Sequence, residues 1–211
     1  MATNVSRKGF DRIQYKDAAS ASGSVGMYYI PSGDSTACFI GDMMKMVDSA
    51  AGATTGDLAM GLPKVVQAAA SSSTDIHIGV LAAVNQHLGV SISNTVLSRK
   101  HRPASVGMYV MIYDDPSEVF SIQCDDAATA GVTFIGSNAD FVVGTGNTTT
   151  GRSASLLDLV SATTTATLPL KIIGVVNSPD NSFQAGDLNM KYRVVINTHV
   201  RNTGTLGMAS D

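Results

Sequence analysis

The histidines and cysteines are the side chains of this sequence with the widest chemical repertoire. The histidines are His77, His87, His101 and His199. They show no metal-ligand spacing and no neighbouring nucleophile motif, so we expect each of them at the surface or at an interface. Cys38 and Cys124 also lack the spacing of a zinc site. We expect two buried thiols, and a single disulfide is the alternative.

An acidic cluster occupies the middle of the chain. Its members are Asp114, Asp115, Glu118, Asp125 and Asp126. A calcium site and an acidic interface patch are two functional interpretations, and polar ends of neighbouring strands are the alternative to both. The oxygen-ligand pattern of an EF-hand loop is absent from the sequence, which weakens the calcium interpretation. We therefore expect neither a metal nor a cofactor, and we do not expect an enzyme.

The densest basic cluster is Arg99-Lys100-His101-Arg102, directly before Pro103. Nucleic-acid binding is disfavoured, because the chain has a net charge of −3 and shows no basic face with interleaved aromatic residues. The remaining interpretations are a solvated loop and a contact with an acidic protein surface, where charge complementarity would fix the register. In the second case Arg99, Lys100 and Arg102 are the contact residues.

Residues 1–23 are polar, mixed in charge and without a sustained period. They predict an extended arm that lies on a partner, with an ordinary disordered terminus as the alternative. The residues expected to contact the partner are Arg7, Lys8, Phe10, Arg12, Ile13 and Tyr15. Under this hypothesis, deletion of residues 1–20 would weaken binding and leave the domain folded.

The composition indicates one β-rich domain over residues 24–211. The chain has 211 residues, of which 44% are hydrophobic and only 15% charged. This charge content is low for a free monomer and predicts that part of the surface is covered. Glu118 is the one glutamate among seventeen acidic residues, as turn-rich structure favours aspartate. The apolar runs are too short to cross a bilayer and a signal peptide is not recognisable, so we expect a soluble protein made in a cytoplasm, without a membrane partner.

Period-two alternation and turn signals predict an all-β fold. The expected strands cover residues 25–30, 62–70, 75–84, 106–113, 118–123, 165–176 and 190–200. We expect residues 106–123 to form a hairpin around Asp114-Asp115-Pro116-Ser117, and residues 156–160 to form one helical turn. The segment 144–151 lacks the lysine of a phosphate-binding loop and is predicted to be a turn. The expected architecture is an antiparallel β-barrel or a jelly-roll-like sandwich, with few short helices.

Several of these segments resemble small virion proteins of tailed bacteriophages, in particular capsid decoration (cement) proteins. The clearest are Tyr113-Asp-Asp-Pro-Ser-Glu-Val-Phe-Ser-Ile-Gln123, Gly136-Ser-Asn-Ala-Asp140, Leu168-Pro-Leu-Lys-Ile-Ile-Gly-Val-Val176 and Tyr192-Arg-Val-Val-Ile-Asn197. The resemblance covers about residues 60–200.

The resemblance implies a virion protein on the outer surface of the shell, with the major capsid protein as its partner. It further implies a homo-oligomer, with a trimer favoured, and it supplies no catalytic residues. The alternatives are another phage structural part, such as a head-fibre base or tail-tube subunit, and a carbohydrate-binding or receptor-binding β-module. The absence of tryptophan disfavours the last of these, since sugar rings stack on exposed aromatic faces.

Overall fold

The computed structural model describes residues 8–15, 25–47, 61–70, 75–84, 99–125, 130–181 and 189–202. Regular structure in these ranges is nearly all β-strand, as predicted. The strands are β1 (Asp11–Tyr15), β2 (Gly26–Ile30), β3 (Cys38–Phe39), β4 (Met43–Met46), β5 (Val65–Gln67), β6 (His77–Val84), β7 (His101–Arg102), β8 (Met108–Tyr113), β9 (Glu118–Gln123), β10 (Asn138–Val142), β11 (Leu156–Thr163), β12 (Leu170–Val175) and β13 (Lys191–Ile196). A short 3-10 helix, η1 (Val132–Phe134), precedes β10.

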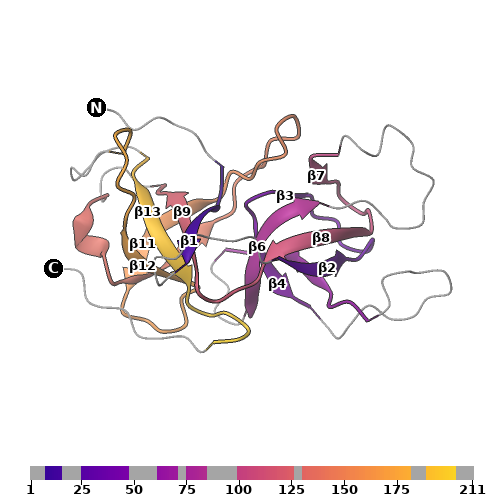
Figure 1. Ribbon diagram of the computed structural model, residues 1–211, viewed down its shortest axis with the longest axis horizontal. Coiled ribbons are helices and arrows are strands. Elements are labelled where there is room, and N and C mark those ends of the chain that lie inside the picture. Colours follow the sequence, from indigo (N-terminus) through magenta and orange to yellow (C-terminus); the bar gives the residue numbers. More distant parts are fainter. Residues whose placement is uncertain are drawn as a thin grey trace.

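The larger sheet has six antiparallel strands in the order β1-β9-β13-β12-β10-β11. It curls, because Cys124 at the end of β9 forms a bridge with Leu157 of β11, but the described strands do not close into a barrel. Alternate residues of these strands point inward and build the main core, which includes Phe120, Phe141 and Tyr192. Figure 1 shows this sheet beside the smaller one. The arrangement is sandwich-like, so the sandwich alternative of the predicted fold is confirmed.

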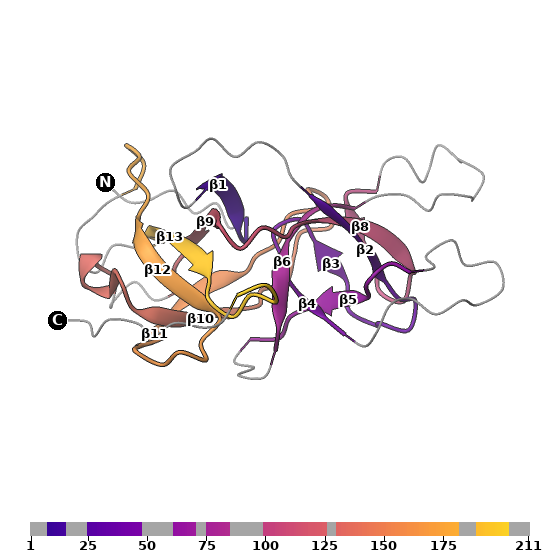
Figure 2. The ribbon, with the colours of Figure 1, turned by 60° about the horizontal axis from the view of Figure 1, so that its bottom comes forward.

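The smaller sheet, in the order β2-β8-β6-β4-β5, is buried on both faces. Met43 and Val80 contact the core of the larger sheet, whereas Met44 and Leu81 belong to a second core. In Figures 1 and 2, β6 stands between the larger sheet and the rest of the smaller one. Gly79 has a φ of 152°, and a Cβ there would lie 1.9 Å from the Tyr113 carbonyl oxygen. Only glycine allows this close approach of β6 to β8.

The predicted hairpin over residues 106–123 is wrong, although both of its strands exist. β8 pairs with β2 and β6 in the smaller sheet, while β9 pairs with β1 and β13 in the larger one. Both edges of β8 are already occupied, so the chain must leave this sheet after Tyr113. The Asp115 side chain accepts a hydrogen bond from the Ser117 amide at 2.8 Å, and this turn directs β9 into the larger sheet.

Most of the other predicted elements are confirmed, with two differences: the strand expected over residues 62–70 is reduced to β5, and the helical turn expected over residues 156–160 is wrong. The strands expected near residues 25–30, 75–84, 165–176 and 190–200 correspond to β2, β6, β12 and β13. Residues 156–160, expected as a helical turn, instead begin β11, because Leu157 and Leu159 alternate into the core. Cys38 and Cys124 are buried in different cores and are not joined in a disulfide. Within the described ranges, no helix is long and apolar enough to cross a membrane.

The predicted N-terminal arm lies only partly within the described residues. Residues 8–15 are extended, but β1 forms the edge of the larger sheet by pairing with β9. The Phe10 ring is 2% exposed and packs edge-to-face on Phe141 and Phe120, with centroids 5.8 and 6.3 Å apart. This part of the segment therefore belongs to the domain, and deletion of residues 1–20 should cost stability. Residues 1–7 and 16–23 lie outside the described ranges.

We predict that Phe10→Ala lowers the free energy of unfolding by about 3–5 kcal/mol, because it leaves a cavity between two aromatic rings. Ile13→Ala, at a 38% exposed position of the same strand, should cost less than about 1 kcal/mol. Urea unfolding of both variants, followed by circular dichroism, measures the difference. Equal stabilities would contradict the assignment of Phe10 to the core.

Candidate docking surface

Four exposed cations, Lys8, Arg99, Lys100 and Arg152, meet at one side of the molecule. We call this group the basic ridge. It draws together three segments that are far apart in the sequence. Their common support is the chain at Ile40, whose amide donates to the Gly151 carbonyl and whose carbonyl accepts from the Ser153 amide, both at 2.9 Å.

The loop 144–152 forms the central part of the ridge and projects at the top of Figure 1. It is held by its own hydrogen bonds, because the Asn147 side-chain oxygen accepts from the amides of Thr149 and Thr150 at 2.9 and 3.0 Å. The Asn147 carbonyl accepts from the Gly151 amide at 2.7 Å. The loop is therefore a defined turn, as the sequence predicted for residues 144–151, and it presents Arg152, which the sequence did not single out.

Lys100 packs on this loop from the smaller-sheet side. Its ammonium group donates to the Thr149 carbonyl at 3.0 Å. Gly151 has a φ of 74°, and a Cβ on it would lie 2.2 Å from the Lys100 carbonyl oxygen. A glycine is required here both for the backbone angle and for the close approach.

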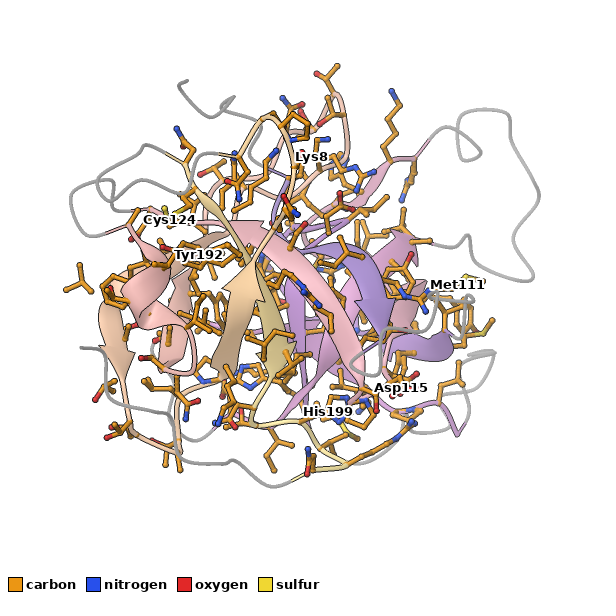
Figure 3. All side chains as sticks on the ribbon, turned by 60° about the vertical axis from the view of Figure 1, so that its left-hand side comes forward. Lys8, Met111, Asp115, Cys124, Tyr192 and His199 are labelled. Carbon is orange, nitrogen blue, oxygen red and sulfur yellow. The ribbon has the colours of Figure 1, made fainter. Side chains whose placement is uncertain are left out.

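Lys8 reaches the ridge from the larger-sheet side and is labelled at the top of Figure 3. The amide of Phe10 donates to the Gly41 carbonyl at 2.9 Å, which holds the chain before β1 in place. A Cβ on Gly9 would lie 2.5 Å from the Ser153 Cβ, so Gly9 packs closely against the Ser153 side chain. Lys8 and Arg152 are thus held on neighbouring stretches of backbone.

The charges of the ridge are not neutralised by the described part of the chain. None of its four cations forms an ion pair with another described residue. In contrast, Lys45, Lys191 and Arg201 pair with carboxylates at 2.7–2.9 Å. A cationic surface in a chain of net charge −3 is suited to an acidic protein surface.

A groove of about 450 Å³ lies beside the ridge, between β1 and the smaller sheet. Its lining includes Ile13, Tyr113 and Arg152. Ile13 is one of the exposed large hydrophobic residues, at 38% exposure. The groove lining thus combines apolar Ile13 with the charged side chains Asp11, Arg12 and Arg152, and protein interfaces commonly combine apolar and charged contacts.

Three of the predicted contact residues are structural instead. Phe10 lies in the core, as described above. The Arg12 guanidinium pairs with buried Glu118 at 2.7 Å and lies over the Tyr113 ring at 4.6 Å. Burial raises the pKa of Glu118 to about 7, and the Arg12 charge opposes that rise. The contact role expected for Phe10 and Arg12 is therefore corrected, whereas Lys8 and Ile13 are exposed.

Arg102, the third of them, is fully buried and holds the segment that leads into β3. Its guanidinium donates to the carbonyls of Pro31 and Asp34 at 2.8 and 2.9 Å, and its Nε donates to the Val106 carbonyl at 2.8 Å. It also contacts the Thr36 carbonyl and pairs with the Asp34 carboxylate at 3.1 Å. Arg99 and Lys100, its neighbours in sequence, are exposed. Arg7 and the side chain of Tyr15 lie outside the described residues.

The acidic cluster divides into separate structural contacts. Asp114 accepts hydrogen bonds from the Tyr28 hydroxyl at 2.8 Å and from Arg201 at 2.9 Å. Asp115 holds the turn before β9, and Glu118 pairs with Arg12, while Asp126 lies outside the described ranges. Among the described residues, no group of three or more His, Cys, Asp or Glu side chains could hold a metal ion.

The histidines differ from the expectation that all lie at the surface or at an interface. His77 and His199 are buried, at 1% and 2% exposure. His101 is partly exposed and stacks on Phe39 with a centroid distance of 5.0 Å, and His87 is outside the described residues. The burial of His77 could have been predicted from the sequence. His77 begins a strand whose following residues are continuously apolar, a pattern typical of strands buried on both faces.

Comparisons with protein-family models, with curated proteins and with solved structures find no match for this chain.

We predict that Arg102→Lys lowers the free energy of unfolding by about 3–5 kcal/mol, because an ammonium group cannot replace a buried, forked guanidinium. Arg99→Lys, at an exposed position three residues earlier, should change it by no more than about 0.5 kcal/mol. Chemical denaturation measures both values. A mild effect at Arg102 would contradict its structural role.

Proposed function

We propose that this chain is a structural virion protein that binds the outer surface of a tailed-phage capsid as a decoration subunit. The observation that carries the proposal is the basic ridge. Its cations come from three distant segments joined by tight glycine contacts, and none of them forms an ion pair within the described part of the chain. The resemblance of the sequence to decoration proteins supports the same function, and so does the low content of charged residues.

The proposed mechanism is thermodynamic. A subunit that binds the assembled shell more tightly than the free capsid protein stabilises the shell by mass action. Each contact needs only modest affinity, because the shell offers many identical sites and an oligomer contacts several of them at once. We propose a trimer as the bound form, as the resemblance implies.

The ridge and the adjacent groove are the proposed contact with the major capsid protein. Exposed cations accelerate association with an acidic protein surface and repel basic protein surfaces. Both effects weaken as salt screens the charges. The groove supplies the apolar part of the contact through Ile13. The buried charge Arg102, which stabilises the fold, belongs to neither the ridge nor the groove lining, so its role is separate from binding.

We predict saturable binding, at a fixed stoichiometry, to empty shells assembled from the major capsid protein of the same phage. Cosedimentation measures the binding, and the bound shells should melt at a higher temperature than bare ones. Failure to bind, together with recovery of the protein in the tail or fibre fraction of virions, would contradict the proposal. Glycan binding without shell binding would indicate a carbohydrate-binding module.

The charge reversals Lys100→Glu and Arg152→Glu should each weaken shell binding about tenfold or more, since a like-charge contact costs several kcal/mol. Lys64→Glu is the matched control, because Lys64 lies beside β2 in the smaller sheet and is not part of the ridge. Unfolding curves establish that all three variants are folded. Unchanged affinity of both ridge variants would show that another surface contacts the shell.

A further inference from the structure

The junction between the two sheets contains two buried histidines, His77 at the start of β6 and His199 beyond the end of β13. They form a backbone bridge in which the His77 amide donates to the Thr198 carbonyl at 3.1 Å. The Val200 amide donates to the His77 carbonyl at 2.8 Å, and the Nδ1 of His77 lies 2.8 Å from the Thr198 hydroxyl. The segment 198–201 therefore ties the larger sheet to the smaller one.

The hydrogen bonding of His199 defines its neutral form. Its Nδ1 accepts from the backbone amide of Arg201 at 3.1 Å, so the proton of the neutral ring is on Nε2. A second proton would have to bind at Nδ1, where it would face the Arg201 N–H. Protonation thus replaces a hydrogen bond with a donor–donor contact inside a buried turn.

His77 has a comparable constraint. Its Nε2 is buried and has no hydrogen-bond partner among the described residues. At His199 the Ile78 backbone favours the charged ring, but burial outweighs it. An imidazolium must donate from both nitrogens, so a charged His77 would leave one buried N–H unsatisfied. The Phe141 ring packs edge-on at 6.1 Å and offers no acceptor for it.

Charged side chains from the neighbouring elements surround both His77 and His199. Asp75 and Lys45 face His77 and are paired with each other at 2.9 Å. Around His199 are Arg201 and the carboxylates of Asp114 and Asp115. Arg201 is bound to Asp114, the residue that begins the crossover from β8. Asp75 and Asp114 are already paired with cations, and burial of the His199 ring outweighs the attraction of the Asp115 carboxylate.

We propose that His77 and His199 form an acid-operated clasp: protonation of the two rings releases segment 198–201 from β6 and loosens the junction between the sheets. The proposal concerns the folded chain itself and does not depend on the identity of its partner. Figure 3 shows His199 and Lys8 at opposite ends of the molecule, so the clasp lies away from the basic ridge.

The direction of the expected pH dependence follows from burial. Burial lowers the pKa of His77 from 6.5 to about 4 and also lowers the pKa of His199. Below pH 6.5 the unfolded chain therefore binds more protons than the folded one, and stability falls as the pH drops towards 4. Burial raises the pKa of Asp42 to about 6 and of Glu118 to about 7, and their contribution has the opposite sign. A comparison of variants is needed to isolate the histidines.

The test compares the wild type with the double variant His77→Asn, His199→Asn. Asparagine at 199 can still accept from the Arg201 amide through its side-chain oxygen, as in an Asx turn, but it does not titrate. Between pH 7 and pH 4.5 the unfolding equilibrium constant of the wild type should rise about tenfold or more relative to that of the double variant. His101→Asn, at the partly exposed histidine, is the control and should behave as the wild type.

Hydrogen exchange locates the effect and does not depend on whether the double variant folds. In the wild type at pH 4.5, amides of segment 198–201 and of β6 near His77 should lose protection before those of β9, after correction for intrinsic exchange rates. Equal acid sensitivity of wild type and double variant would overturn the proposal. So would full protection of segment 198–201 at pH 4.5, or an Nδ1–H tautomer of His199 in ¹⁵N NMR spectra at pH 7.

Discussion

The double-sided burial of the smaller sheet is the constraint on which the rest of the structure depends. β8 is hydrogen-bonded on both edges and lies in a sheet that is packed on both faces, so the chain cannot turn back beside it. It must cross to the larger sheet through residues 114–117. Asp114, at the start of this crossover, binds both Tyr28 and Arg201 and thereby anchors each sheet to the junction.

This crossover also determines where the two halves of the molecule meet. At one end of the junction, segment 198–201 is bound to β6. At the other end the backbones near Gly9, Gly41 and Gly151 touch, because side chains at these positions would collide with their neighbours. The basic ridge is a consequence of the second contact, since its cations are carried by the segments that these glycines bring together.

The sequence predicted the fold class and most strands, because period-two alternation reports directly on a pleated surface with one buried face. It did not predict the strands with which β8 and β9 pair, since the Asp-Asp-Pro-Ser turn at residues 114–117 is compatible with a hairpin and with a crossover alike. The prediction of a helical turn over residues 156–160 was wrong for a related reason. A short apolar run fits one helical turn as well as a strand, and only the partner β10 decides between them.

The candidate site was predicted in part, for a physical reason. Arg99 and Arg102 are equally basic in sequence, yet one is exposed and the other is buried among carbonyl groups that local patterns do not reveal. Arg152 was not selected at all, because it stands alone in a Gly-Thr-Asn turn and joins the ridge only through the tertiary contact with Ile40. Buried charges and assembled patches both depend on long-range pairing.

Electron cryomicroscopy of the virion is the most direct test of whether this chain binds the capsid surface through the basic ridge. We expect density for this chain on the outer surface of the capsid, with Lys8, Lys100 and Arg152 facing acidic side chains of the major capsid protein. Density for the chain in the tail or in fibres would contradict the proposed function. A capsid-bound chain whose ridge faces solvent would contradict the assignment of the docking surface.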